Sequence, residues 1–140
     1  MQNFKHRFPI QIRFKDIDRM GHVNNAVYLT FIETARVHYF DSVVGHGNKW
    51  SHSVGLILAR TEIDYKAPVF LRDTISVLTR CARIGTKSIT IEWVMVRENS
   101  PTEEVVAQGI SVLVCYDYDK NATIAVPDEH RRLLEAYEKQ

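Results

Sequence analysis

The sequence predicts a single α+β domain in which an antiparallel sheet of five strands wraps around a long hydrophobic helix. Three observations favour this fold class. A helical pattern from Ala26 to about Val43 is apolar on almost every side over its first half, so most of that half should be covered. Three later segments follow the period of two that strands require, and a fourth, over 105–116, is almost continuously apolar, as expected of a central strand covered on both faces. Short turns join those segments, which indicates antiparallel neighbours.

The remaining elements follow from periodicity and turn residues. A first strand is expected over 8–15, with four apolar residues sharing one face: Phe8, Ile10, Ile12 and Phe14. Turns containing glycine or proline bound the four later strands, which are expected over 57–65, 74–83, 88–97 and 105–116. A short C-terminal helix is expected from Pro127 to about Lys139, and the segment 45–53 shows no regular pattern.

Asparagine and glycine residues mark the two ends of the long helix. The Asn24 side chain can accept a hydrogen bond from a free N–H of the first turn, so Asn24 is the expected N-cap. Gly45 is expected just beyond the C-terminus, where a left-handed residue is common. Glu33 and Arg36 stand three residues apart on this helix and can pair with each other on a wetter face.

The chain shows no internal repeat or linker, so one domain is expected to span residues 1–140. An open sheet of five strands leaves unpaired N–H and C=O groups along its edges. Pairing two sheets edge to edge removes this exposure. We therefore expect a homodimer or a dimer of dimers.

The composition excludes several classes of function. The net charge of +1 provides no basic field for nucleic-acid binding. Cys81 and Cys115 fall inside strand patterns without zinc-ligand spacing, so we expect buried thiols, no metal and no cofactor. No segment is apolar for the ~20 residues that a membrane span needs, so we expect a cytoplasmic protein without membrane contact.

One segment places two carboxylates, Asp16 and Asp18, shortly before the long helix. The same segment contains Gly21, His22, Asn24 and Asn25. Free N–H groups and the positive end of the helix dipole point into the region before a helix. Hydrolysis at an activated carbonyl needs a group that activates or replaces water, together with donors for the developing oxyanion. An aspartate facing a helix N-terminus supplies both, although aspartate in such a loop also serves as a simple cap or turn residue.

The same segment resembles the signature of the 4-hydroxybenzoyl-CoA thioesterase family, whose members are hotdog-fold acyl-CoA thioesterases. The pattern has the form Asp-x-Asp-x-x-Gly-His-Val-Asn-Asn-x-x-Tyr over 16–28, followed by Glu-x-Ala-Arg over 33–36. Residues 63–73 resemble the second strand of the family and the turn after it, so the likeness spans about 8–118. It implies a hotdog fold and hydrolysis of an acyl-CoA thioester to the free acid and coenzyme A.

The resemblance also implies roles for individual residues. Asp18 matches the catalytic carboxylate, acting as nucleophile or as general base toward water, and the backbone N–H of Asn25 matches the donor to the thioester carbonyl. Asp16 is expected to support the loop. Substrate-binding candidates lie near this carboxylate and at a hairpin turn: His22, Asn24, Tyr28, Arg83, Lys87 and Ser88. Each also has a structural interpretation, in the loop, the helix cap, the core or a solvated turn.

Other functions stay open on sequence alone. Acyl carrier protein presents the same pantetheine arm as coenzyme A and is an alternative carrier of the acyl group. A hotdog hydratase or dehydratase needs a histidine in its own motif, and His22 follows Asp18 by four residues without that context. A non-catalytic acyl-thioester binding protein is the third alternative. The sequence does not identify the acyl group of the substrate. Four residues are candidates for the acyl pocket or for ordinary core: Phe31, Ile32, Ile57 and Trp93.

Overall fold

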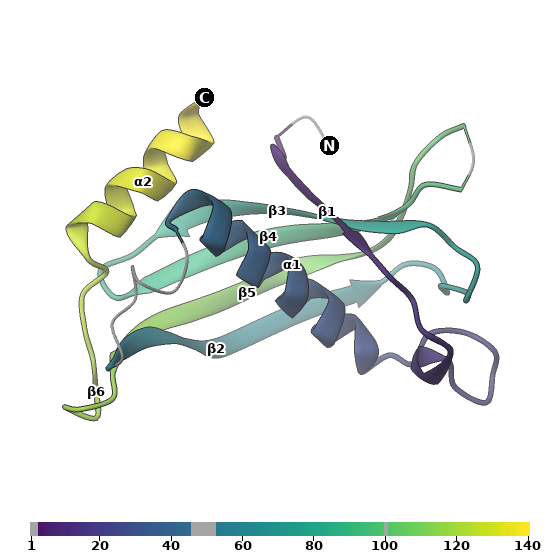
Figure 1. Cartoon of the computed structure of the whole chain (residues 1–140), viewed down its shortest axis with the longest axis horizontal. Helices are drawn as coiled ribbons and strands as arrows, with labels where there is room; N and C mark the ends of the chain where they lie inside the picture. Colours follow the sequence, from purple (N-terminus) through teal and green to yellow (C-terminus); the bar gives the residue numbers. More distant parts are fainter. Residues whose placement is uncertain (1–2, 46–52, 100) are drawn as a thin grey trace.

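The computed structural model describes residues 3–45, 53–99 and 101–140. Its elements follow the predicted order along the chain (Figure 1). They are β1 (His6–Ile10), the 3-10 turn η1 (Phe14–Asp16), α1 (Val27–Val43), β2 (Val54–Tyr65), β3 (Ile75–Ile84), β4 (Ser88–Arg97), β5 (Glu104–Asp117), β6 (Ala122–Thr123) and α2 (Asp128–Lys139). Almost all of the segment predicted to be irregular, 45–53, lies outside the described residues. No helix within these ranges is long and apolar enough to cross a membrane.

The strands form one antiparallel sheet in the order β1-β3-β4-β5-β2, and β6 pairs with the end of β5. Thr79 of β3 lies opposite Trp93 of β4, which in turn lies opposite Gly109 of β5. On the other side of β5, Gly109 lies opposite Ile63 of β2. The predicted antiparallel sheet is confirmed. The additional strand β6 has only two residues, too few to show any periodicity.

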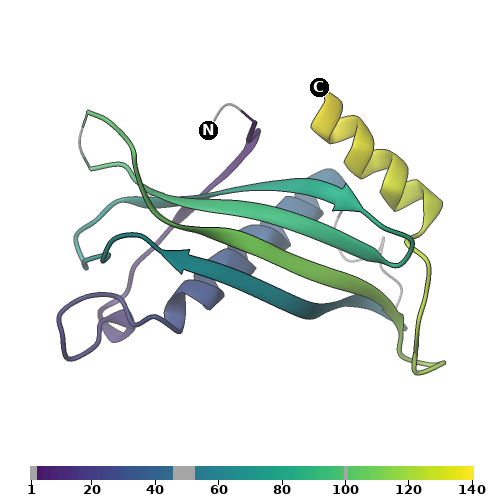
Figure 2. The ribbon, with the colours of Figure 1, turned by 180° about the vertical axis from the view of Figure 1, so that it is seen from behind.

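Helix α1 crosses one face of the sheet, which we call the inner face (Figures 1 and 2). The main hydrophobic cluster joins residues of the helix and of this face: Tyr28, Phe31, Ile32, Ala35, Val77, Trp93 and Met95. Burial of a large apolar side chain contributes roughly 1.5–3 kcal/mol before the loss of conformational entropy is subtracted. The opposite side of the helix is open in the single chain, since Leu29 is 41% exposed. The expectation that the first half of the helix is covered on most sides is therefore wrong for one chain.

Helix α2 packs at the end of the sheet away from the loop between β1 and α1 (Figure 1). Its Leu134 is buried in a second cluster with Tyr39, Cys81 and Cys115. Both thiols are free and buried, as predicted, and burial raises the pKa of each to about 11. Neither sulfur is a thiolate at neutral pH, so neither is suited to act as a nucleophile.

The first strand is shorter than predicted. β1 ends at Ile10, and the chain then turns through η1. The Asp16 carboxylate accepts a hydrogen bond from the Arg13 N–H at 2.8 Å, and this local bond takes the place of further strand pairing. Phe14 is consequently 82% exposed and does not share the inward face of a strand. The predicted strand over 8–15 is therefore wrong beyond Ile10.

Strand β2 is an edge strand that pairs only with β5 within the described part of the chain. Its other side carries unpaired backbone groups from Val54 to Tyr65. Apolar side chains accompany this edge, since Ile57 is 36% and Leu58 is 46% exposed. A long edge strand with exposed apolar neighbours favours pairing with a second chain.

Candidate active site

The loop between β1 and α1 folds back on itself before the helix starts. Ile17 and Val23 form an isolated antiparallel bridge across its base. The Asp18 N–H donates to the His22 carbonyl at 2.9 Å, and the Gly21 N–H donates to the Asp18 carbonyl at 3.0 Å. Gly21 has a φ of 90°, in the left-handed region that favours glycine. Asp18 thus stands on a compact, hydrogen-bonded turn, and Asp16 precedes this turn at the end of η1.

The Asp18 carboxylate lies at the surface of this turn, with its side chain 26% exposed. Its Oδ1 accepts a hydrogen bond from the Met20 N–H at 2.8 Å. Its Oδ2 lies 3.8 Å from Nδ1 of His22 and makes no hydrogen bond among the described residues. His22 also contacts Phe70, with ring centroids 6.5 Å apart. One carboxylate oxygen is therefore fixed by the loop, while the other is free to meet a substrate or a water molecule.

Asp16 supports the same loop from inside the protein. It is 2% exposed, and its carboxylate accepts hydrogen bonds from the Arg13 backbone at 2.8 Å and from Nη2 of Arg13 at 3.0 Å. Its carbonyl accepts the Asn24 N–H at 2.9 Å. Burial raises the pKa of Asp16, but the hydrogen bonds and the charge of Arg13 outweigh burial, and the pKa lies below its usual value. Asp16 therefore ties the loop to the helix start.

Replacing Asp16 with asparagine is expected to lower the free energy of unfolding at neutral pH by about 1–3 kcal/mol, because Arg13 loses a charged acceptor. The depressed pKa in the folded state means that this stabilisation is complete above the unfolded pKa of about 4 and disappears as the pH falls through the folded pKa. The difference between wild type and Asp16→Asn should therefore close in acid. Denaturant titrations from pH 7 to pH 2 measure it, and a difference that stays constant contradicts this ion pair as its cause.

The residues before α1 present backbone donors to the loop. Oδ1 of Asn24 accepts the Ala26 N–H at 2.8 Å, and the Asn24 carbonyl accepts the Val27 N–H at 2.9 Å. The cap position of α1 is Ala26 and has no side-chain cap. The predicted N-cap at Asn24 is therefore wrong in position, because Asn24 closes a separate turn before the helix. The Asn25 N–H makes no hydrogen bond among the described residues and is available to a ligand.

The chain around the end of β2 holds the helix start from the other side. The Tyr65 hydroxyl donates to the Asn25 carbonyl at 2.8 Å, and its ring contacts Tyr28 with centroids 4.9 Å apart. The Val23 N–H donates to the Val69 carbonyl at 2.7 Å. Tyr28 is 2% exposed and belongs to the main cluster, where burial raises the pKa of its hydroxyl. The structure thus places Tyr28 in the core behind the loop.

The other predicted binding residues lie at the opposite end of the sheet (Figure 1). β3 begins at Ile75, opposite Ile10 and near the loop, and its far end carries Arg83. The hairpin that follows carries Lys87, whose Nζ donates to the Thr123 hydroxyl at 3.1 Å, and then Ser88. A single chain therefore does not bring these three residues to Asp18.

A groove between α1 and β2 was not predicted from the sequence, because it forms only where this particular strand lies beside the helix. One part of it is lined by Leu29, Ile32, Glu33, Arg36, Leu58 and Thr61. The adjoining part continues past Phe40, Leu56 and Leu113 and holds about 390 Å³. Of the acyl-pocket candidates, Ile32 lies on this groove, whereas Phe31 and Trp93 pack in the main cluster.

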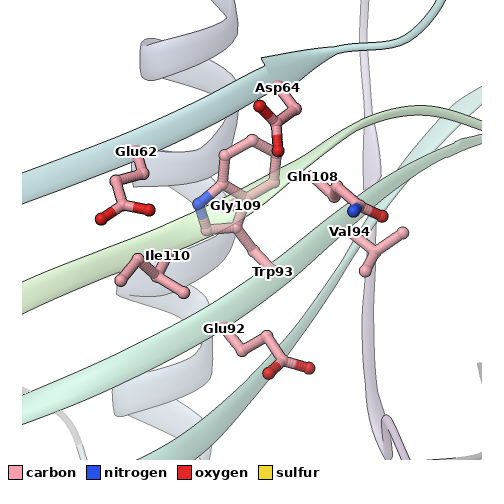
Figure 3. Close-up of a pocket in the computed structure, with 8 residues that line it drawn as sticks. All are labelled: Glu62, Asp64, Glu92, Trp93, Val94, Gln108, Gly109 and Ile110. Atoms are coloured by element: carbon pink, nitrogen blue, oxygen red, sulfur yellow. The ribbon is translucent and has the colours of Figure 1, made fainter.

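A second hollow lies on the outer face of the sheet (Figure 3). Because successive residues of a strand point to opposite faces, the residues on either side of inward Trp93 and Ile63 point outward here. Three of them are carboxylates: Glu62, Asp64 and Glu92. Arg60 pairs with Glu62, and Arg80 pairs with Glu92 at 3.1 Å, so two of these charges are neutralised locally. The acyl-pocket candidate Trp93 lines this hollow, whereas none of the predicted catalytic or substrate-binding residues does.

Solved structures share the architecture described above. A thioesterase of Thermus thermophilus, crystallised with coenzyme A and zinc, matches with a TM-score of 0.84 at 31% identity over 100% of this chain and 98% of that chain. The PA5185 protein of Pseudomonas aeruginosa PAO1 matches with a TM-score of 0.85 at 31% identity over 96% and 92%. The sheet and its helix are those of the hotdog thioesterases, which confirms the predicted fold class. In the described residues of the present chain, no three His, Cys, Asp or Glu side chains converge to hold a metal ion.

The sequence itself belongs to the thioesterase-like superfamily, whose family model matches residues 12–134. Long-chain acyl-CoA thioesterase FadM of Escherichia coli K12 is 29% identical over 126 residues, which are 90% of this chain and 94% of the relative. Acyl-CoA thioester hydrolase YbgC of Escherichia coli O6:H1 is 25% identical over 127 residues, 86% of this chain and 89% of the relative. The predicted family and the enzyme class, thioesterase, are confirmed.

Proposed function

We propose that the chain hydrolyses an acyl-CoA thioester to the free acid and coenzyme A, with Asp18 as the catalytic carboxylate. The observation that carries this proposal is that Asp18 and the unpaired Asn25 N–H stand on one loop, which the Asp16–Asn24 bond folds against the start of α1. A thioester carbonyl bound between them meets an attacking group on one side and an oxyanion donor on the other. The positive end of the α1 dipole adds to the same field.

Two chemical routes use this arrangement, and both release coenzyme A as the thiol. As a nucleophile, Asp18 adds to the carbonyl, expels the thiolate and leaves a mixed anhydride that water then cleaves. As a general base, Asp18 takes a proton from the water that attacks the carbonyl, and passes that proton to the leaving sulfur. Single-turnover reactions in oxygen-18 water distinguish them, because label found in the Asp18 carboxylate requires the anhydride.

The test of the proposal is thiol release from a panel of acyl-CoAs that differ in chain length and include aromatic acyl groups. Turnover with at least one of them supports the proposal. The absence of turnover with every one refutes it, and three further assays then separate the alternatives. Cleavage of acyl carrier protein thioesters alone indicates a different carrier, hydration of crotonyl-CoA indicates a hydratase, and binding without any reaction indicates a non-catalytic protein.

We further propose that two copies pair through β2 and complete the coenzyme A site. Antiparallel pairing of two β2 edges reverses one sheet relative to the other, so the far end of the partner lies beside the Asp18 end. The partner's Arg83, the partner's Lys87 and the partner's Ser88 then reach the end where the thioester binds. Their cationic and hydroxyl groups suit the phosphates of coenzyme A. The two free cysteines fit a reducing compartment, and we propose a cytoplasmic enzyme.

Mixing two inactive variants tests the shared site. One chain carries Asp18→Asn and the other carries Arg83→Ala with Lys87→Ala, so each homodimer lacks one half of every site. A random mixture contains one intact site in each heterodimer, and we expect recovery of about a quarter of the wild-type activity. Native mass spectrometry must show that subunits exchange. Exchange without recovery contradicts a site built from both chains.

A further inference from the structure

Arg36 is a buried cation without a close acceptor in the part of the chain that the structure describes. It lies on α1 and is 8% exposed. Among the described residues, its guanidinium lies 3.5 Å from the Ser111 hydroxyl and 3.9 Å from the Glu33 carboxylate. Both distances exceed the ~2.7–2.9 Å of strong charge-assisted hydrogen bonds. Burial lowers the pKa of Arg36, which reflects a charge that its surroundings satisfy only in part.

The guanidinium faces the groove between α1 and β2. Arg36 lines both parts of that groove, between Leu29 and Leu58 on one side and Phe40 and Leu113 on the other. These neighbours are apolar and offer the guanidinium no acceptor. Arg36 is therefore a polar spot in a channel whose other lining residues are mostly apolar, apart from the carboxylates of Glu33 and Asp41 and the hydroxyls of Thr30 and Thr61.

Two hydroxyl groups complete this polar spot. The Ser111 hydroxyl, 1% exposed, lies 3.5 Å from the Thr61 hydroxyl, and Thr61 donates to the Ile110 carbonyl at 3.2 Å. Because Thr61 lines the groove and Ser111 contacts Arg36, the three side chains gather at one point along it. Among the described residues, most of the donors of the guanidinium still lack a partner there.

The groove leads away from the catalytic end of the molecule. An α-helix rises 1.5 Å per residue, so Arg36 lies about 16 Å along the helix direction from Asn25. This length matches on the order of a dozen carbon–carbon bonds of an extended chain, each about 1.5 Å long and inclined to its axis. β2 forms the second wall, running from Tyr65, which holds Asn25, past Thr61 to Leu58.

We propose that Arg36 determines specificity by binding an oxygen acceptor at the distal end of a long acyl chain, so that the preferred substrates are thioesters of ω-hydroxy or dicarboxylic acids. The inference rests on the proposed function, because the acyl chain has to enter the groove from the Asp18 end. The acceptor supplies the close hydrogen bonds that the described residues do not give Arg36. Glu33, 65% exposed, attracts the same guanidinium. Its negative charge opposes the binding of a substrate carboxylate more than the binding of a neutral hydroxyl.

The test compares kcat/KM for unsubstituted, ω-hydroxy and dicarboxylic acyl-CoAs over chain lengths from eight to sixteen carbons. We expect an oxygenated chain to exceed its unsubstituted counterpart by at least about tenfold at the matching length. Arg36→Met keeps an unbranched side chain but removes the donors, and should bring this ratio to about one. Arg60→Met, which removes an exposed arginine paired with Glu62, should leave the ratio unchanged. The ratio within one variant does not depend on the folded fraction.

Either of two kinetic results overturns the inference. The first is a wild-type enzyme that favours unsubstituted chains at every length. The second is a kcat/KM ratio of oxygenated to unsubstituted chains that Arg36→Met leaves unchanged. Both exclude recognition of a distal oxygen by Arg36, while the proposed hydrolysis is unaffected. Loss of the dimer in sedimentation, with the ratio unchanged, assigns Arg36 to a contact with a second copy instead. If no acyl-CoA is cleaved, the proposed function fails separately, and dissociation constants of the same chains with Asp18→Asn still give the binding ratio for Arg36.

Discussion

Replacing Asp18 with asparagine is expected to lower the rate of thioester hydrolysis by about a hundred- to ten-thousand-fold while acyl-CoA binding persists. The asparagine side chain keeps an oxygen that can accept the Met20 N–H, now at 2.8 Å, so the loop should retain its shape. It has lost the anion that attacks the carbonyl or takes a proton from water. Initial rates of thiol release measure the loss, and calorimetric titration of an acyl-CoA measures binding.

Asp64→Asn is the matched control for Asp18→Asn. Asp64 is exposed on the outer face of the sheet, opposite to the face that α1 covers, and its replacement removes the same charge. We expect its rate to stay within twofold of wild type. Circular dichroism establishes that both variants are folded. An Asp18→Asn variant that is folded and turns over within tenfold of wild type contradicts the catalytic role.

The elements with strong periodicity were predicted closely from the sequence. The helix expected from Ala26 to about Val43 is observed as Val27–Val43, and the strand expected over 88–97 is β4, Ser88–Arg97. Gly45, with a φ of 114°, follows the helix as a left-handed residue, and its N–H donates to the Phe40 carbonyl at 3.2 Å. These features follow from apolar spacing and turn residues, which act within a few positions of the chain.

Periodicity and turn residues do not predict hydrogen bonds between side chains and backbone, or contacts between elements. The Arg13–Asp16 bond that ends the first strand gives no periodic signal, and so Phe14 was assigned to the wrong environment. Sequence spacing did not separate the two aspartates, and the roles expected for them came from the family resemblance. The structure supplies a physical difference, since Asp16 is 2% exposed and the Asp18 side chain is 26% exposed. Arg36 drew attention only as a partner of Glu33, because the groove it faces exists only once β2 lies beside α1.

Replacing Gly109 with alanine is expected to lower the free energy of unfolding by about 3 kcal/mol. A Cβ at this position would lie 1.9 Å from the carbonyl oxygen of Glu62 and 2.9 Å from Cζ2 of Trp93. The first atom belongs to the backbone of β2, so the clash is relieved only if β2 moves away from β5. Trp93, 2% exposed, has little room to yield on the other side. A thermal melt should show the midpoint lowered by roughly 10 °C.

Gly55→Ala is the matched control, since Gly55 also lies in the pairing of β2 with β5. A Cβ there meets only the ring of Tyr118, at 3.5 Å, which is an ordinary contact. We expect a change within about 1 kcal/mol, in the stabilising direction, because alanine restricts the unfolded chain. An equal loss of stability in both variants would attribute the effect to strand glycines in general rather than to the close approach of β2 at Gly109.

The Gly109 substitution should also reach the active site, because β2 carries Tyr65 and forms one wall of the groove. Movement of β2 draws the Tyr65 hydroxyl away from the Asn25 carbonyl, to which it donates at 2.8 Å, and loosens the turn that presents the Asn25 N–H. Measured well below the melting temperature, kcat/KM should fall more for Gly109→Ala than for Gly55→Ala. An unchanged kcat/KM with a lowered melting temperature would mean that β2 yields only around Glu62. In that case the loop and the start of α1 hold the catalytic geometry without help from the edge strand.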